Sequence, residues 1–124
     1  DKIRNHFGLS RISQAGALAA LKDQAYVSTI VQKVAKSRKT LAQIAQDNGL
    51  IPLPSATNFV TIDCGSDGNF ARTVMEQMIA RAVFIRMPAV APMNRCIRIS
   101  CGDEAAMALV AKTLPKALKA ARSS

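Results

Sequence analysis

Cys96-Ile97-Arg98-Ile99-Ser100-Cys101-Gly102 is a short β-branched run with one arginine at its centre. Side chains alternate between the two faces of a strand. The predicted faces are Ile97, Ile99 and Cys101 on one side and Cys96, Arg98 and Ser100 on the other. The first face suits a hydrophobic core, whereas the second presents a permanent cation. Because a guanidinium pairs best with carboxylate or phosphate, Arg98 is a candidate binding residue. A protein carboxylate or a solvated face remains the alternative.

Two more strands are expected, at residues 58–63 and 83–86, and the third strand extends over residues 96–101. One helix is predicted after the Ser66-Asp67-Gly68 turn and another after Asp103, which should cap it. Pro115 should kink or interrupt this last helix. The order of elements predicts an α+β fold, a small and mainly antiparallel three-stranded sheet with helices on one face. If the strands pair in register, the open face would collect Phe84, Arg86, Cys96, Arg98 and Ser100.

The N-terminal part of the chain should form two helices. The first begins at the N-cap Ser10 and runs through Leu21, and its alanines and glycine make it thin. The second spans residues 24–47 with an amphipathic stripe, and Asn48-Gly49 is a typical helix stop. At about 36 Å, by the rise per residue, this helix is longer than a small domain needs. We therefore expect it to bridge two bodies.

Composition limits the remaining possibilities. The 124 residues amount to one domain, and the 49% apolar content is enough for a core. No apolar run is long enough to cross a membrane, and the N-terminal residues show no signal-peptide layout. Three cysteines without metal-ligand spacing indicate neither a disulfide framework nor a metal site, and we expect a reducing cytoplasm. The net charge of +9 suggests nucleic acid as a partner, but the cations are scattered over helices, so no nucleic-acid binding is expected.

Four ordered segments carry a family resemblance. They are residues 3–7 leading into 13–21 (SQAGALAAL), residues 54–60 (PSATNFV), residues 83–86 (VFIR) and residues 97–102 (IRISCG). Together they resemble the C-terminal part of fold-type I pyridoxal-phosphate enzymes, the class I and II aminotransferases. The histidinol-phosphate aminotransferase-like branch is the most similar.

The resemblance implies that this chain is part of a longer, homodimeric enzyme. Residues 1–24 would be a remnant of the large cofactor-binding domain, and residues 25–124 the small domain. The position matching Arg98 clamps the α-carboxylate of an amino acid or 2-oxo acid substrate. Arg86 would line the same cleft, or would pair with a carboxylate of the missing large domain. Pyridoxal 5'-phosphate would be bound to a lysine outside this chain, so the chain alone should be inactive.

Two departures from the family pattern leave questions open. Ala82 stands where the family commonly has Gly, so the preceding helix should lack an easy left-handed cap. The loop over residues 87–95 is apolar and proline-rich, with few groups for a substrate phosphate. An aliphatic or aromatic amino acid is therefore as plausible a substrate as histidinol phosphate. The alternative function is a stand-alone α+β module in which Arg86 and Arg98 bind a small carboxylate.

Overall fold

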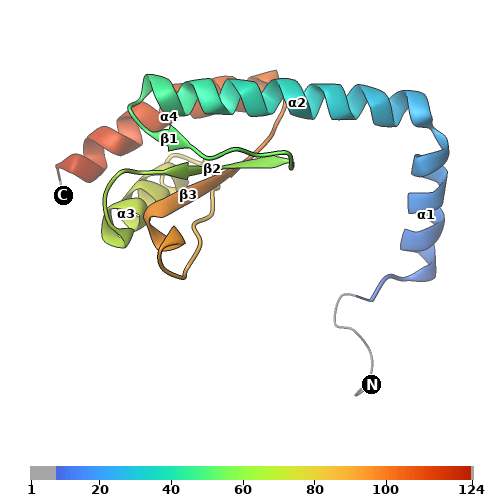
Figure 1. Ribbon diagram of the computed structural model, residues 1–124, viewed down its shortest axis with the longest axis horizontal. Helices are drawn as coiled ribbons and strands as arrows, with labels where there is room; N and C mark the ends of the chain where they lie inside the picture. Colours follow the sequence, from blue (N-terminus) through green and yellow to red (C-terminus); the bar gives the residue numbers. More distant parts are fainter. Residues whose placement is uncertain (1–7, 124) are drawn as a thin grey trace, which may run out of the picture. The chain divides into compact units, whose positions relative to one another are not determined.

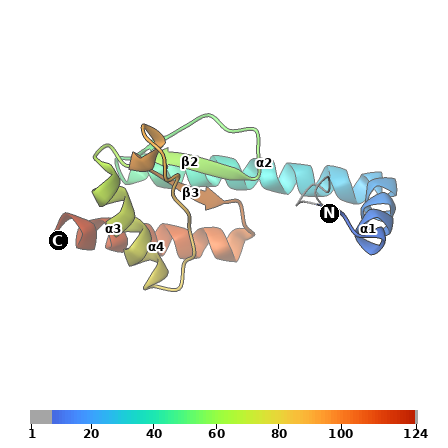
Figure 2. The same ribbon diagram turned by 90° about the horizontal axis from the view of Figure 1, so that it is seen from below.

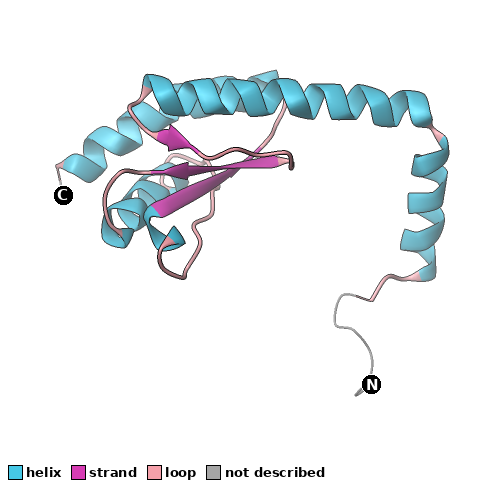
Figure 3. Cartoon of the chain, viewed as in Figure 1, coloured by secondary structure: helices cyan, strands magenta, loops and turns pink. Residues whose placement is uncertain are grey.

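The structure is a computed structural model that describes residues 8–123 (Figures 1 and 3). Residues 3–7, which contribute to the family resemblance, lie outside the described range. The chain divides into two compact units, Asp1–Gln32 and Lys33–Ser124. In the first unit, α1 spans Arg11–Lys22, and the Ser10 hydroxyl accepts a hydrogen bond from the Ser13 N–H at 3.1 Å. The predicted helix and its N-cap are confirmed, and α1 has no buried residue.

Helix α2 spans Gln24–Asp47, as predicted. It ends in a Schellman motif, in which the Leu50 N–H donates to the Ala45 carbonyl and Gly49 has a φ of +74°. Glycine adopts this left-handed conformation without steric cost, which explains why the helix stops there. The buried residues of α2 are Ser37, Leu41, Ile44 and Ala45.

The sheet is antiparallel with the order β1-β2-β3, formed by Ile51–Pro52, Phe59–Asp63 and Cys96–Ser100. The prediction of a strand over residues 83–86 was wrong. That segment makes a single isolated bridge, between Arg86 and Arg98, and Ile51–Pro52 supplies the third strand instead. Pro88 has no N–H, so it cannot continue the ladder beyond Arg86 towards Cys96.

One face of the sheet carries the core. The β2–β3 register places Val60 and Ile62 beside Ile97 and Ile99, and all four are at most 3% exposed. Helices α3, Gly68–Ile79, and α4, Glu104–Arg122, pack side by side (Figure 2) and add their apolar stripes to this cluster. Their most deeply buried residues are Ala71, Val74, Met78, Leu114 and Ala117. The α+β class and the three-stranded antiparallel sheet are therefore confirmed.

Helix α4 continues through Pro115 to Arg122, so the predicted interruption was wrong. The predicted cap is confirmed, because the Asp103 carboxylate accepts from the Ala106 N–H at 2.8 Å. Pro115 itself is exposed, whereas Leu114 and Leu118 are almost fully buried. The free energy gained by burying these leucines offsets the loss of the one backbone hydrogen bond that proline cannot make.

Helix α3 also ends in a left-handed turn, contrary to the sequence expectation. The Val83 N–H donates to the Met78 carbonyl at 3.0 Å, and the Ala82 N–H donates to the Ile79 carbonyl at 2.9 Å. These are the two bonds of a Schellman motif, with Ala82 at a φ of +60°. Alanine thus takes the position that favours glycine, at a steric cost of about 1–2 kcal/mol.

Candidate functional site

Arg86 and Arg98 lie directly opposite each other across the isolated bridge. The Arg86 N–H donates to the Arg98 carbonyl at 3.0 Å, and the Arg98 N–H donates to the Arg86 carbonyl at 2.6 Å. Residues opposite each other in an antiparallel pair project to the same face, which here is the face turned away from the core. The predicted convergence of the two arginines is therefore confirmed by the backbone pairing.

Cys96 does not belong to the open part of this face, although its parity places it there. It is 2% exposed and lies opposite Asp63 in the register. Asp63 is also buried, and its carboxylate accepts from Arg95 Nη2 at 2.5 Å and from the Gly65 N–H at 2.9 Å. The exposed members of the predicted set are therefore Phe84, Arg86 and Ser100, with Arg98 half-buried.

Arg98 is held by an aromatic ring and not by a carboxylate. Its Cζ atom lies 4.7 Å from the centroid of the Phe59 ring. Among residues 8–123, the ion pairs are Lys36–Glu104 and Arg95–Asp63, so neither Arg98 nor Arg86 is paired with a carboxylate of the described chain. A half-buried guanidinium without a carboxylate partner is a suitable binding group for an anionic ligand.

Arg86 is more open to solvent. Its Cζ atom lies 5.9 Å from the centroid of the exposed Phe84 ring. It also lines a hollow of about 610 Å³ together with Arg72 and Asn94. Arg86 therefore pairs with Arg98 in the bridge and also lines this hollow beside α3.

Sequence reasoning missed Phe59 and Asp63 as neighbours of the arginine pair. Phe59, Thr61 and Asp63 alternate along β2 and lie opposite Ser100, Arg98 and Cys96. The alternation was visible in the sequence, but the register between β2 and β3 was not. A shift by one residue would have turned these side chains into the core.

The cysteines offer no nucleophile for this site. Burial raises the pKa of the Cys64 thiol to about 11, and burial also raises the pKa values of Cys96 and Cys101. All three are free thiols. Because the thiolate is the reactive form, these residues are poor nucleophiles at neutral pH.

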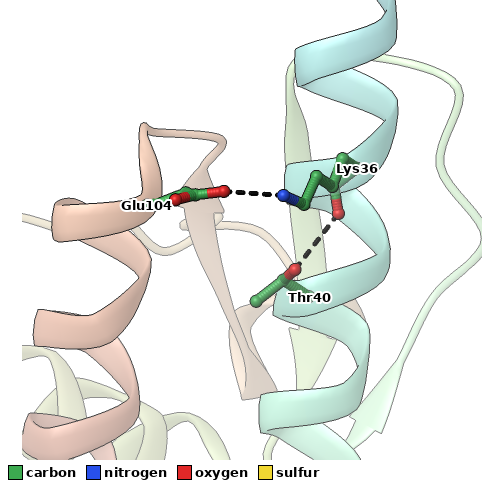
Figure 4. A network of polar contacts seen from close by, with 3 residues as sticks. All are labelled: Lys36, Thr40 and Glu104. Atoms are coloured by element: carbon green, nitrogen blue, oxygen red, sulfur yellow. Dashed lines mark hydrogen bonds and ion pairs between the residues drawn. The ribbon is translucent and has the colours of Figure 1, made fainter.

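A second hollow, of about 770 Å³, lies between α2 and the beginning of α4. Lys36 and Glu104 both line it. Figure 4 shows the two side chains pointing toward each other from α2 and α4, and Nζ and Oε1 are 2.6 Å apart. Their hydrogen bond raises the pKa of Lys36 and lowers that of Glu104. Both side chains are exposed, so the pair is solvated and satisfied. Beside it, Ser37 Oγ accepts from the Gly102 N–H at 3.2 Å, which fixes the end of β3 against α2.

Comparison with known proteins identifies the family. Residues 1–114 match the sequence model of the class I and II aminotransferases. The chain belongs to this family. The predicted resemblance is therefore confirmed, and the open face with its arginine pair is part of an aminotransferase fold.

Several histidinol-phosphate aminotransferases are similar to this chain. The crystal structure of the enzyme from Sinorhizobium meliloti, in complex with pyridoxal-5'-phosphate, is 53% identical with a TM-score of 0.87, and the match covers 97% of this chain and 33% of that one. The enzyme from Geobacillus sp. (strain WCH70) is 31% identical over 96% of this chain and 32% of its own length. The enzyme from Geotalea daltonii is 33% identical over 86% of this chain and 30% of its own length. The chain thus spans about a third of the relatives that it matches.

The described residues do not fit covalent attachment of pyridoxal phosphate. Such a lysine needs a lowered pKa, which burial or a neighbouring cation provides. Every lysine within residues 8–123 is exposed on a helix, and the pKa of Lys36 is raised. Also within residues 8–123, no helix is both long and apolar enough to cross a membrane.

Proposed function

We propose that this chain is the substrate-binding, C-terminal part of a pyridoxal-phosphate-dependent aminotransferase, which transfers an amino group between an amino acid and a 2-oxo acid. Residues 1–24 are assigned to the large domain and residues 25–124 to the small domain. The observation that carries the proposal is the Arg86–Arg98 bridge, which presents two cations on the open face without a carboxylate partner in the described chain.

Arg98 is assigned to the α-carboxylate of the substrate. A guanidinium and a carboxylate form two parallel hydrogen bonds, which fix the orientation of the ligand as well as its position. Partial burial strengthens such a pair relative to a fully exposed one. Arg86 has a secondary role at the same face, with the distal part of the substrate or with a large-domain carboxylate as its partner.

The cofactor and its lysine belong to the rest of the proposed enzyme. When bound, pyridoxal phosphate supplies an electron sink for the substrate. We propose that the lysine that holds it lies outside this chain, and the exposure of the described lysines supports this. The chain alone is therefore inactive, and the complete protein is a homodimer of the cytoplasm.

Two observations point to different substrates for the proposed enzyme. The relatives are named for histidinol phosphate, whereas the loop over residues 87–95 is apolar. A panel of amino donors distinguishes these possibilities: histidinol phosphate, L-phenylalanine and L-leucine, each with 2-oxoglutarate as the acceptor. Turnover of at least one donor by the cofactor-loaded full-length protein is expected. Turnover of none contradicts the proposed function.

Replacing Arg98 by Lys tests the clamp. The variant keeps the charge but loses the planar fork of the guanidinium. We expect kcat/KM for 2-oxoglutarate to fall by a factor that corresponds to about 2–4 kcal/mol of transition-state binding. Steady-state kinetics of the full-length protein measures this. An unchanged kcat/KM contradicts the assignment of Arg98. A substrate-analogue complex in which the Arg86 guanidinium lies far from both ligand and cofactor would reject its secondary role.

The alternative is a stand-alone module that binds a small carboxylate, and the same two arginines favour it. The mass of the natural gene product separates the two functions. A product about three times the length of this chain, like the relatives, supports the aminotransferase. A product of 13.2 kDa supports the module.

A further inference from the structure

We infer that Phe59 is a positioning residue that holds the Arg98 guanidinium ready for the substrate carboxylate. The inference rests on the proposed function, since it assigns a supporting residue to the same site. Phe59 lies on β2 opposite Ser100, and Arg98 lies on β3 opposite Thr61. The two residues are therefore diagonal neighbours on one face, within reach for an aromatic ring and a long side chain.

The contact between them is a cation–π interaction. The distance of 4.7 Å from the Arg98 Cζ atom to the ring centroid is well within the range of such contacts. A guanidinium over an aromatic ring uses its flat face for the contact. The N–H groups lie in the plane of the guanidinium and remain available for a carboxylate. The ring can thus restrict the side chain without competing for its hydrogen bonds.

The backbone of Phe59 is itself fixed by the preceding turn. Its carbonyl accepts from Ser55 Oγ at 2.6 Å and from Thr57 Oγ1 at 3.3 Å. The Thr57 carbonyl in turn accepts from Arg38 Nη1 of α2 at 2.9 Å. The ring therefore stands on a strand that is tied to a helix, which is what a supporting residue requires.

The other arginine provides an internal comparison. The Phe84 ring centroid lies 5.9 Å from the Arg86 Cζ atom, at the limit of a cation–π contact, and Phe84 is 74% exposed. No side chain of the described residues is hydrogen-bonded to the Phe84 backbone. We therefore assign a positioning role to Phe59 and none to Phe84, which makes Phe84→Leu a matched control.

The experiment compares Phe59→Leu, Phe59→Tyr, Phe84→Leu and Arg98→Lys in the cofactor-loaded full-length protein. Leucine keeps an apolar side chain but removes the π system. We expect Phe59→Leu to raise KM for 2-oxoglutarate by roughly 3- to 30-fold, the range of cation–π contacts, with kcat changed far less. Phe59→Tyr should stay within about twofold of the natural protein, because tyrosine retains the ring face. Phe84→Leu should change KM far less than Phe59→Leu does.

The pattern of kcat and KM separates positioning from a structural role. A variant that only unfolds or inactivates part of the protein lowers kcat per total protein and leaves KM unchanged. That result for Phe59→Leu, or a loss in Phe59→Tyr equal to that in Phe59→Leu, overturns the inference. If Arg98→Lys is also without effect, the proposed clamp itself fails. If Arg98→Lys is impaired and Phe59→Leu is not, only the role of Phe59 fails.

NMR spectroscopy of the same protein tests the contact without catalysis. The Phe59 ring should shift the Arg98 side-chain resonances upfield, because the guanidinium lies over its face. The shift should disappear in Phe59→Leu and persist in Phe59→Tyr. Unchanged Arg98 resonances in Phe59→Leu would show that the ring does not hold the side chain, and would overturn the inference.

Discussion

Helices α1 and α4 are both rich in apolar residues, yet they differ completely in burial. Helix α4 buries a stripe of seven residues, whereas α1 buries none. Ile12 is 86% exposed and Leu21 is 62% exposed. Amphipathic sequence therefore provides a surface that can be buried, but a partner decides whether it is. We propose that the partner of α1 lies in the rest of a longer aminotransferase, since the chain spans about a third of the length of its relatives.

Truncating one isoleucine in each region should give the largest contrast. Ile97→Ala removes a fully buried side chain from the core, and we expect a loss of about 2–5 kcal/mol in the free energy of unfolding. Ile12→Ala should change it by less than about 0.5 kcal/mol. Urea denaturation of the chain measures both. Equal effects would show that α1 is packed like the core.

Gly102 tests how tightly the unit Lys33–Ser124, which contains the sheet, is packed. A Cβ atom at this position would meet the Ala106 Cβ at 2.7 Å and the Met107 Cε at 3.3 Å. Gly102→Ala should therefore destabilise the fold by about 1–3 kcal/mol. The double variant Gly102→Ala/Ala106→Gly should recover part of this loss, which thermal unfolding can measure. Recovery would assign the cost to the contact with Ala106, whereas a loss that is merely additive would contradict it.

The two Schellman motifs should respond in opposite directions. Ala82→Gly removes the steric cost of a left-handed alanine at the end of α3, and we expect a gain of about 1 kcal/mol in stability. Gly49→Ala introduces the same cost at the end of α2 and should lose about 1 kcal/mol. Chemical denaturation measures both variants. A loss for Ala82→Gly would contradict the left-handed conformation.

The exposed residues of the first unit should affect association more than stability. Leu9, Ile12, Leu18, Leu21 and Val31 are all exposed, and Val27 is half-exposed, so we expect the isolated chain to dimerise or aggregate. Leu18→Glu with Leu21→Glu should weaken association without lowering the unfolding midpoint. Sedimentation at micromolar concentration measures this. A monomeric natural chain would contradict the expectation and favour the stand-alone module.

Local signals predicted the elements well. The capping residues Ser10 and Asp103 and the stop at Gly49 are short-range features, so the ends of the helices at these residues follow from the sequence. Strand β1 could not be predicted in this way, because Ile51–Pro52 is a strand only through its pairing with β2. The structure also differs from the prediction at Pro115, where the helix continues, and at Ala82, which takes the left-handed conformation. At both positions tertiary packing outweighs the local conformational cost.

The candidate site was predictable only in part. The alternation around Arg98 placed it on the open face, and the bridge to Arg86 followed the predicted convergence. Phe59 and Asp63 could not be placed beside the arginines, because the register between β2 and β3 depends on long-range packing.

A crystal structure of the cofactor-loaded full-length protein with bound 2-oxoglutarate tests the central claim most directly. The quantity to measure is the distance between the Arg98 guanidinium nitrogens and the carboxylate oxygens next to the keto group. We predict two hydrogen bonds of roughly 2.7–3.2 Å, with the guanidinium over the Phe59 ring. A structure in which Arg98 pairs with a protein carboxylate, and other residues bind that end of 2-oxoglutarate, would contradict the account.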